Sequence, residues 1–442
     1  MKAIMRDKEE LKSSGIEWIG EIPQHWHTEN IKYHFDVIAG ATPDSKNPEY
    51  WDGDITWVTP ADYRTEDKYV KCGKRSLSLA GYQACSASLT PKGSIIFSKR
   101  APIGTVALST TELCTNQGCL ACVPKASVNS TYYYYVMSIA TEEFELKGAG
   151  TTFKEISANN FLNTKLPCLG CEEQQVIANY LDDRCSKIDA IIAEAKASIE
   201  EYKELKQAVI YEAVTKGLEK NTELKIVNNH GIDKAPKSWN KIKLGWFCSF
   251  HNGDRSNKYP SGNDFQDYGV PFIGADSLNE IYVNIDKCRY ITSKKYEDMG
   301  GLKIRKDDIL YTLRGSTIGK CAITNFDHGT VASSLTGIRV EKTDKLYPMF
   351  LLYWLQSQCE YNQRTILING ATAPNLSAEN VGQYNLFIPS LDEQMSIAQF
   401  LSNVLGKYNS LLYEKQYLIE DLESYKKSLI YEVVTGKRKV VA

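Results

Sequence analysis

The sequence predicts an α+β fold in which two mixed α/β modules are connected to two long helices that pack together as a coiled coil. Three observations support this prediction. The heptapeptide IYEAVTK at 210–216 returns as IYEVVTG at 430–436, each copy ends a long segment with helical apolar spacing, and short apolar runs between turn residues fill the remainder. A period of about 220 residues is far longer than that of a solenoid repeat, so the chain contains two whole units in tandem.

The bulk composition is that of a globular protein of two or three domains. The 442 residues are 43% hydrophobic and 24% charged, with a net charge of −2, which counts against coating nucleic acid by overall positive charge. No apolar run approaches the ~20 residues of a membrane span, and the segment 1–15 lacks the apolar core of a signal peptide. These features predict a cytoplasmic protein whose twelve cysteines are mostly reduced.

The duplication is clearest when 173–216 is aligned with 393–436, because this alignment needs no gap. Fifteen of the 44 aligned positions are identical, where chance would give about two or three. In the first copy these are Glu173, Gln174, Ile177, Ala178, Leu181, Lys187, Glu194, Ile199, Glu200, Lys206, Ile210, Tyr211, Glu212, Val214 and Thr215.

Each copy is expected to form one helix of roughly 65 Å, with a break near residue 185 and with Gly217 and Gly436 as C-caps. A helix with one apolar face cannot bury that face alone, so we expect the two stripes to meet in a seam. The alternative is that each helix packs only on its own module. The seam residues are Ile188, Ile192, Ile199, Tyr202, Val209, Tyr408, Leu412, Ile419, Leu422 and Leu429, and Ala195, Leu205, Tyr425 and Val433 continue the pattern.

The segments before the helices also correspond, although more faintly. IPQHW at 22–26 matches APKSW at 235–239, KGSIIFSKRAPIG at 92–104 matches KDDILYTLRGSTIG at 306–319, and GTTFKEISANN at 150–160 matches GATAPNLSAEN at 370–380. The intervening residues have diverged, as expected for two related binding modules with different targets. Short β-branched runs predict strands, and YYYYVMSIATEEFELKG and LYPMFLLYWLQSQCEYNQR each predict one amphipathic helix.

Several fragments imitate catalytic or metal-binding motifs, but each lacks a required feature. NPEY at 47–50 has Glu where adenine methyltransferases have a second Pro, and GSTIGKC at 315–321 is one residue short of a P-loop. Cys119 and Cys122 have zinc-like spacing, as do Cys168 and Cys171, but the first pair lies in the apolar run GCLACV, where residues three apart in a strand point to opposite faces. We therefore expect no catalytic residue and no bound metal.

A set of motifs in fixed order resembles the specificity (S) subunit of type I restriction–modification systems. The set comprises GIEWIGEIPQHW at 15–26, TPDSKNPEYWDGDITWVTPADY at 42–63, FSKRAPIG at 97–104, LPCLGCEEQ at 166–174, IPSLDEQ at 388–394 and LIYEVVTGK at 429–437. Together these motifs extend over nearly the whole chain. Two departures are visible: the first junction is two residues longer than the second, and the second module lacks a clear copy of NPEYW.

The resemblance implies two target recognition domains, each followed by a conserved helix, with the helices packed antiparallel in pseudo-two-fold symmetry. Each domain would read one half of a bipartite, asymmetric site in double-stranded DNA. Two methyltransferase (M) subunits would dock, and restriction (R) subunits would join for cleavage. This chain would bind no cofactor, with S-adenosylmethionine, ATP and Mg²⁺ on the partner subunits. The implied boundaries are 1–27 for an N-terminal segment, 28–170 and 221–390 for the recognition domains, and 171–220 and 391–442 for the helices.

Recognition is expected to depend on polar loop residues, because base reading needs donors and acceptors at groove edges while Arg and Lys on phosphates set position. Arg100 and Arg314 are the strongest candidates, since each follows an apolar strand and precedes an Ile-Gly turn. The full set of candidate DNA-binding residues is Lys46, Lys99, Arg100, Thr151, Thr152, Lys154, Arg255, Lys258, Arg314, Ser316, Thr317 and Asn375.

Three other functions remain open at this point. The chain is compatible with a free-standing DNA-binding regulator, with a coiled-coil scaffold whose lobes bind protein, and with a methylase–nuclease system that lacks a translocating subunit. A pull-down with a cognate methyltransferase followed by DNA retardation separates the scaffold from the DNA readers.

Overall fold

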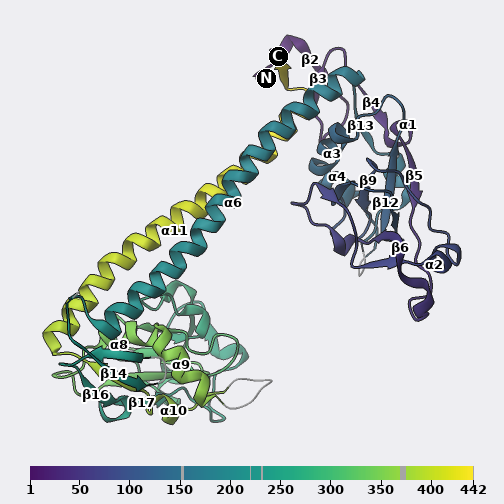
Figure 1. Cartoon of the computed structure of the whole chain (residues 1–442). Helices are drawn as coiled ribbons and strands as arrows, with labels where there is room; N and C mark the ends of the chain where they lie inside the picture. The colour runs from purple at the N-terminus through teal and green to yellow at the C-terminus, as the bar shows by residue number, and fades with distance from the viewer. Residues whose placement is uncertain (151–153, 220, 230–231, 369–374, 442) are drawn as a thin grey trace. The chain divides into compact units, whose positions relative to one another are not determined.

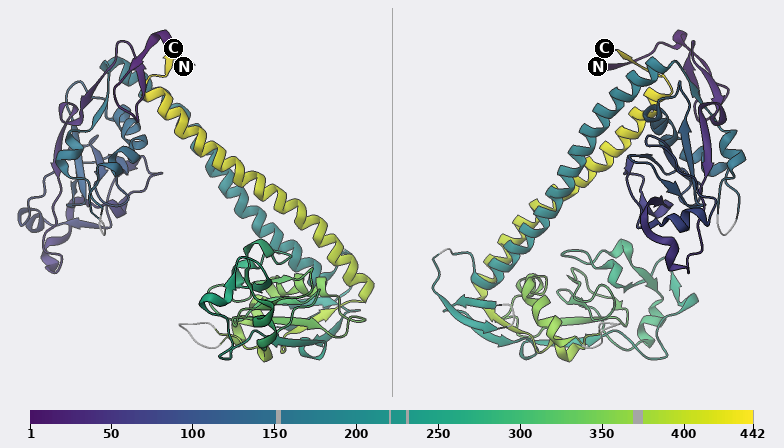
Figure 2. Two further views of the ribbon diagram at one scale, coloured as in Figure 1. Left: turned by 180° about the vertical axis from the view of Figure 1, so that it is seen from behind. Right: turned by 45° about the vertical axis from the view of Figure 1, so that its right-hand side comes forward.

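The computed structural model describes residues 1–150, 154–219, 221–229, 232–368 and 375–441. The chain forms two compact units, one made of Met1–Ala195 with Tyr417–Ala442 and the other of Lys196–Gln416. Each unit holds one α/β module and parts of both long helices, α6 (Cys171–Lys216) and α11 (Leu391–Val434), which run side by side (Figures 1 and 2). Among the described residues no helix is long and apolar enough to cross a membrane.

The first module has two sheets. The larger has the order β5-β12-β9-β10-β7, and only β7 runs parallel to its neighbour. Its strands are β5 (Phe35–Ala39), β7 (Tyr69–Val70), β9 (Ile95–Ser98), β10 (Val106–Ser109) and β12 (Cys119–Pro124). The smaller has the order β11-β6-β8, with β6 (Trp51–Val58), β8 (Arg75–Leu77) and β11 (Cys114–Thr115). The module's helices are α1 (Ile31–His34), α2 (Leu79–Gln83), α3 (Ser130–Ile139), α4 (Thr141–Leu146) and α5 (Ala158–Leu162).

The second module repeats this plan. One sheet has the order β17-β24-β21-β22, with β17 (Cys248–Asn252), β21 (Ile309–Thr312), β22 (Cys321–Ile323) and β24 (Leu335–Val340). The other has the order β18-β20-β19-β23, with β18 (Phe265–Gln266), β19 (Val270–Ile273), β20 (Arg289–Ile291) and β23 (Thr330–Val331). The helices are α7 (Ser293–Asp298), α8 (Pro348–Leu355), α9 (Gln358–Leu367) and α10 (Ala378–Val381).

The structure locates the copy of NPEYW that the sequence does not show. In the first module a short 3-10 turn at Pro48–Tyr50 leads into Trp51, which pairs with Leu77. In the second module the corresponding turn is Gly262–Asp264, which leads into Phe265 paired with Ile291. The structural counterpart of NPEYW is therefore SGNDF at 261–265. It is hidden because only the backbone geometry and the aromatic ring are shared.

The single amphipathic helix expected in each module is wrong. Each segment forms two helices, with the break at Ala140 between α3 and α4 and at Gln356–Ser357 between α8 and α9. The first helix of each pair is buried on all sides rather than on one face, as the burial of Tyr132–Met137 and Phe350–Leu355 shows. A helix that is apolar all round belongs to a core, so the polar residues fall in the second helix.

The two long helices pack antiparallel. In the first unit Lys426 of α11 bonds Asp189 of α6 at 2.6 Å. In the second unit Lys206 of α6 bonds Asn409 of α11 at 3.0 Å, and the rings of Tyr202 and Tyr408 lie 6.0 Å apart. Residue numbers rise along one helix as they fall along the other. The break expected near residue 185 is wrong, because α6 is continuous from Cys171 to Lys216.

The predicted seam is buried to different degrees along its length. Ile188, Ile192, Ile419 and Leu429 are buried, whereas Ile199, Tyr202, Val209, Tyr408, Leu412 and Leu422 are half-buried. Leu205 and Tyr425 are wrong as members of the stripe, since they are 49% and 51% exposed. A straight helix drifts relative to a 3.5-residue period, so a stripe extrapolated over many turns leaves the interface. Gly217 and Gly436, which follow the two helices, have φ of 80° and 74°, as C-caps require.

Each helix is joined to its module by the same set of contacts. The Trp26 indole donates to Glu173 at 3.0 Å, and the Trp239 indole donates to Glu393 at 3.2 Å. In each copy the next residue, a buried glutamine, bonds backbone groups of the module on both sides. These paired contacts explain why Glu-Gln opens both copies of the repeat.

Paired strands complete the connections at the helix ends. β4 (His27–Asn30) pairs with β13 (Lys165–Cys168), as β16 (Asn240–Lys243) pairs with β25 (Asn385–Ile388). β2 (Leu11–Ser13) pairs with β3 (Glu21–Pro23), as β14 (Leu224–Asn229) pairs with β15 (Ile232–Pro236). One further pair, β1 (Lys2–Met5) with β26 (Arg438–Val441), joins the first and last strands of the chain.

Candidate nucleic-acid interface

The loops that carry most of the predicted site residues gather at one end of the β5-β12-β9-β10-β7 sheet in the first module and of the β17-β24-β21-β22 sheet in the second; we call this end of each module its loop end. In the first module the loop after β9 begins with Lys99, whose amide bonds Gly118 and whose carbonyl accepts from Ile156, both at 3.0 Å. In the second module the amide of Leu313 bonds Ser334 at 2.8 Å and its carbonyl accepts from Leu376 at 3.0 Å. Three equivalent chain segments therefore meet at the equivalent end of the two sheets.

A glycine at the end of the first strand permits this close approach. A Cβ on Gly40 would lie 2.1 Å from the carbonyl oxygen of Asn116, and one on Gly253 would lie 2.3 Å from that of Ala332. No side chain tolerates such a distance to backbone, so the position requires glycine. The loops 41–47 and 254–260 start from these glycines and are held against the rest of the loop end.

The two strongest sequence candidates occupy equivalent places. Arg100 forms an isolated backbone bridge with Glu155, and Arg314 forms one with Asn375. The side chains meet as well: Arg100 Nε donates to Glu155 Oε2 at 2.8 Å, and Arg314 Nε donates to Asn375 Oδ1 at 3.0 Å. The scaffold is thus shared, but a carboxylate in one module stands where the other has a neutral amide.

This difference changes the charge of the two loop ends. Glu155 also pairs with Lys99 at 2.8 Å. Burial opposes ionisation of Glu155, but hydrogen bonds from Lys99 and Arg100 outweigh it and hold the Glu155 pKa below its ordinary value. In the second module burial lowers the pKa of Arg255, and the positive charge of nearby Arg314 lowers it further. Glu155 therefore offsets positive charge at the loop end of the first module, whereas the neutral Asn375 at the equivalent place does not.

Sequence reasoning missed the partners across the loop end. Arg255 Nε donates to the carbonyl of Ser333 at 3.4 Å, and in the first module Thr42 donates to Gln117 at the corresponding places. Thr42, Gln117 and Glu155 are polar, lie in the same loop cluster and differ in kind from their counterparts. The signal that could have found them is their position opposite Arg255, Ser333 and Asn375 in the repeat.

The remaining predicted residues are distributed over the same loops. Lys46 and Lys258 are exposed in the loops that follow the first strand of each module, and Ser316 and Thr317 are exposed in the loop after β21. Lys154 is exposed next to the Glu155 bridge. Thr151 and Thr152 lie outside the described residues.

Buried and half-buried side chains of each module hold these loops in place. Trp51 donates its indole N–H to the Asp44 carbonyl at 3.2 Å, and Trp57 donates to the Ala41 carbonyl at 3.0 Å, which fixes the loop that carries Lys46. In the second module Arg364 lies under Gly319, at the end of the loop that carries Arg314, and its Nε bonds the buried Glu360 at 2.9 Å. Burial raises the pKa of Glu360, although the charge of Arg364 opposes this.

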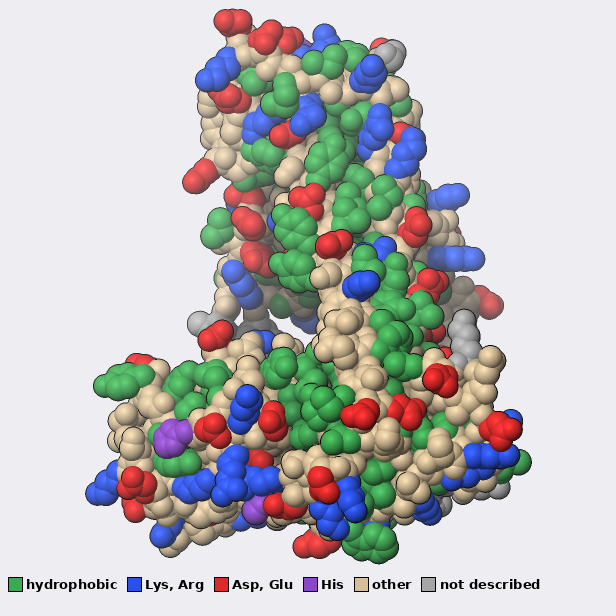
Figure 3. All heavy atoms as spheres, turned by 90° about the vertical axis from the view of Figure 1, so that its left-hand side faces the viewer, with side chains coloured by type: hydrophobic (Ala, Val, Ile, Leu, Met, Phe, Trp, Pro, Cys, Tyr) green, Lys and Arg blue, Asp and Glu red, His purple; other side chains and the backbone are tan. Residues whose placement is uncertain are grey.

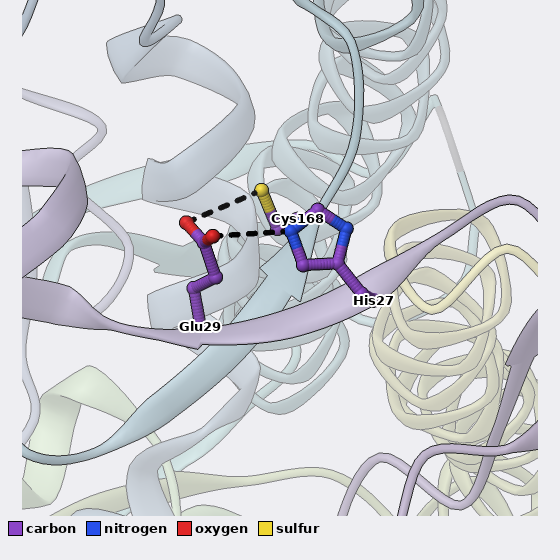
Figure 4. Close-up of side chains that lie close together, drawn as sticks. All are labelled: His27, Glu29 and Cys168. Atoms are coloured by element: carbon purple, nitrogen blue, oxygen red, sulfur yellow. Dashed lines mark hydrogen bonds and ion pairs between the residues drawn. The ribbon is translucent and has the colours of Figure 1, made fainter.

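One cluster outside the loop end has metal-ligand residue types. Figure 4 shows His27 and Glu29 of β4 with Cys168 of β13, whose ligand atoms lie within 4.8 Å of one another. Glu29 accepts from His27 at 3.1 Å and from the Cys168 thiol at 3.6 Å. Burial, with a further contribution from Glu29, raises the pKa of Cys168 to about 11. The repeat replaces the three by Asn240, Ile242 and Ile388, so we interpret the cluster as a hydrogen-bonded connection between two strands.

The cysteines show no further metal-type grouping among the described residues. None of the twelve forms a disulfide. Cys119 and Cys122 are buried in β12, where burial raises the pKa of both thiols, to about 12 for Cys119. Cys171 is exposed at the start of α6, and Cys168 bonds Glu29 instead.

The chain has two duplicated modules on an antiparallel helix pair, and the modules present different polar groups from equivalent loop positions. This arrangement is that of a recognition protein with two binding modules. Residues 23–201 and 236–420 match the family of the type I restriction modification DNA specificity domain, and the chain belongs to this family. It is the specificity component of a type I restriction–modification system, which recognises DNA and is not the catalytic subunit.

Similar proteins of the same kind are found in archaea and bacteria. The MjaIX specificity subunit of Methanocaldococcus jannaschii is 29% identical over 96% of this chain and 95% of its own length. The EcoBI specificity subunit of Escherichia coli is 24% identical over 71% of this chain and 66% of its own.

Solved structures share the fold at lower sequence identity. A chain from a structure of type I system assembly and conformational transition has a TM-score of 0.72, with 16% identity over 94% of this chain and 99% of that one. The HsdS subunit of Thermoanaerobacter tengcongensis has a TM-score of 0.51, with 16% identity over 94% and 98%.

Proposed function

We propose that each module reads one half of a bipartite, asymmetric DNA site and that the antiparallel helix pair sets the distance between the halves. The observation that carries this proposal is the loop end, where one scaffold holds Glu155 and Thr42 in one module but Asn375 and Arg255 in the other. A shared framework with exchanged donors and acceptors is what two heads reading different bases require.

The helix pair also offers a surface for two methyltransferase subunits. Figure 3 shows hydrophobic side chains gathered along the helical column. The exposed hydrophobic side chains of α11 include Tyr413, Tyr417 and Tyr425, which are 74%, 63% and 51% exposed. An exposed apolar face of this kind marks a protein interaction site. Restriction subunits would join this assembly for cleavage.

The chemistry of the assembly belongs to the partners. S-adenosylmethionine, ATP and Mg²⁺ act on the methyltransferase and restriction subunits, and this chain contributes recognition in the cytoplasm. The recognition domains extend over 28–170 and 221–390, with the helical segments at 171–220 and 391–442.

Exchange of one module tests the proposal. Replacing residues 28–165 with the corresponding segment of a relative is expected to change one half-site and to leave the other half-site and the spacer intact. The exchange keeps α6, α11 and the junction residues Trp26 and Glu173. Sequencing methylated adenines in cells that express the chimaera reads out both halves. A change in both halves would show that the modules do not read independently.

Removal of one loop arginine is expected to act on one half-site only. Arg314→Ala should weaken binding of the complex to its DNA by about 1–3 kcal/mol, because a guanidinium that contacts a base loses its hydrogen bonds. The matched control is Arg305→Ala, at the opposite end of β21 and also exposed. Arg100→Ala should cost less, since Glu155 already neutralises part of its charge. Unchanged affinity and methylation in both loop variants would remove these arginines from the interface.

A further inference from the structure

Two arginines outside the predicted set occupy the same place in both modules. Arg75 of β8 lies opposite Trp57 in the ladder, and Arg289 of β20 lies opposite Phe272. Each guanidinium is stacked on an aromatic ring: the central carbon of Arg75 is 3.6 Å from the Trp51 ring centroid, and that of Arg289 is 3.9 Å from the Phe265 centroid. Trp51 and Phe265 are the corresponding residues of the hidden NPEYW copy.

The ring under each arginine belongs to a duplicated aromatic pair. The centroids of Trp51 and Trp57 are 5.0 Å apart in an edge-to-face arrangement, and those of Phe265 and Phe272 are 5.6 Å apart. Because Trp51 also bonds the carbonyl of Asp44, Arg75 is adjacent to the loop that carries Lys46 and Thr42. In the second module the ring of Tyr259, in the corresponding loop, lies 5.7 Å from that of Phe272.

Both stacked arginines are exposed and keep their N–H groups open. Among the described residues, the side chains of Arg75 and Arg289 have no hydrogen-bond or ion-pair partner, whereas Arg100 and Arg314 have theirs in Glu155 and Asn375. Stacking on a ring holds the guanidinium plane in place without using its donors. An arginine fixed in this way has already lost much of its rotamer freedom, so an acceptor that offers two oxygens to the guanidinium, as a phosphate does, can bind at lower entropic cost.

We propose that Arg75 and Arg289 are phosphate-binding residues that each hold the DNA backbone beside the bases read by their module. This inference rests on the proposed function. The phosphate is favoured over a base edge because the two modules have diverged at the reading loops but share this arginine and its ring. A contact common to two heads with different targets fits the ligand common to both half-sites, which is the backbone.

The test measures binding of the complex with its methyltransferase subunits as salt is varied. One duplex carries the sequence methylated in the host genome, and the other is a scrambled duplex of equal composition. Arg75→Ala is expected to weaken binding to both duplexes by the same factor, about tenfold. It should also reduce, by about one, the magnitude of the slope of the logarithm of the binding constant against the logarithm of the salt concentration. Arg289→Ala should do the same, and the loss of affinity in the double variant should be the product of the two single losses. Lys92→Ala, an exposed lysine that precedes β9, is the control and should change neither quantity.

Each other outcome has a distinct meaning. Unchanged affinity and slope would overturn the inference. A loss confined to the methylated sequence would assign the arginines to bases and overturn the backbone role. If Arg75→Ala melts at a lower temperature, a second variant, Arg75→Met, covers the Trp51 ring with a side chain that has no N–H groups. DNA binding by Arg75→Met at the wild-type level would then show that Arg75 has a structural role and does not bind phosphate. If the wild-type complex binds the two duplexes with equal affinity, the proposed function itself fails, and this inference fails with it.

Discussion

Replacing Ile419 with Asp is expected to separate the two long helices and to abolish methylation of the bipartite site. Ile419 is 3% exposed in α11, so the variant loses apolar burial and places a charge in a buried position. The expected loss of stability is about 3–5 kcal/mol. Urea unfolding of the purified full-length chain measures the loss, and methylome sequencing measures the consequence for recognition.

The neighbouring residue provides the control. Leu418 lies on the same helix but is 42% exposed, so Leu418→Asp should change the free energy of unfolding by less than about 0.5 kcal/mol. Ile199→Asp should fall between the two, because Ile199 is only half-buried. Equal effects of all three substitutions would mean that the apolar seam does not hold the pair together.

The internal repeat made the architecture predictable from one sequence. A match of two segments without a gap requires that their side chains meet similar surroundings twice, which is why the Glu-Gln junction and the helices were found. The paired contacts of Trp26 with Glu173 and of Trp239 with Glu393 are the physical counterpart of those identities. The limits of the seam were not predictable, because helical drift over more than forty residues is set by the packing of the pair and not by local spacing.

The loop ends were predictable only in part. Arg100 and Arg314 follow recognisable strands, so their equivalence could be read directly. Glu155 and Thr42 could not be assigned, since their role depends on which chain segments meet after three strands have paired. The stacked arginines were missed for a related reason. Trp51 and Phe265 differ in identity, and changes in loop length shift the offset between the modules, so the match appears only in the ladder register.

Lengthening the helix pair is expected to lengthen the non-specific spacer between the half-sites. One heptad would be inserted into α6 and one into α11, at facing positions between the Asp189–Lys426 pair and the Lys206–Asn409 pair. Seven residues return the apolar stripe to within about 20° of its original face, so the seam is kept. They add about 10.5 Å of helix, which corresponds to about three base pairs at 3.4 Å each.

The size of the insertion separates a ruler from a passive support. An insertion of five residues turns the stripe by about 140° and should inactivate the complex, although the added length is similar. The heptad variant should stay active with weaker binding, because three base pairs turn DNA by about 100° while the added heptad turns the helix far less. If the helices only dock methyltransferase subunits, the spacing is set elsewhere. Methylome sequencing then finds an active heptad variant with an unaltered spacer, which would contradict the role of the helix pair as a ruler.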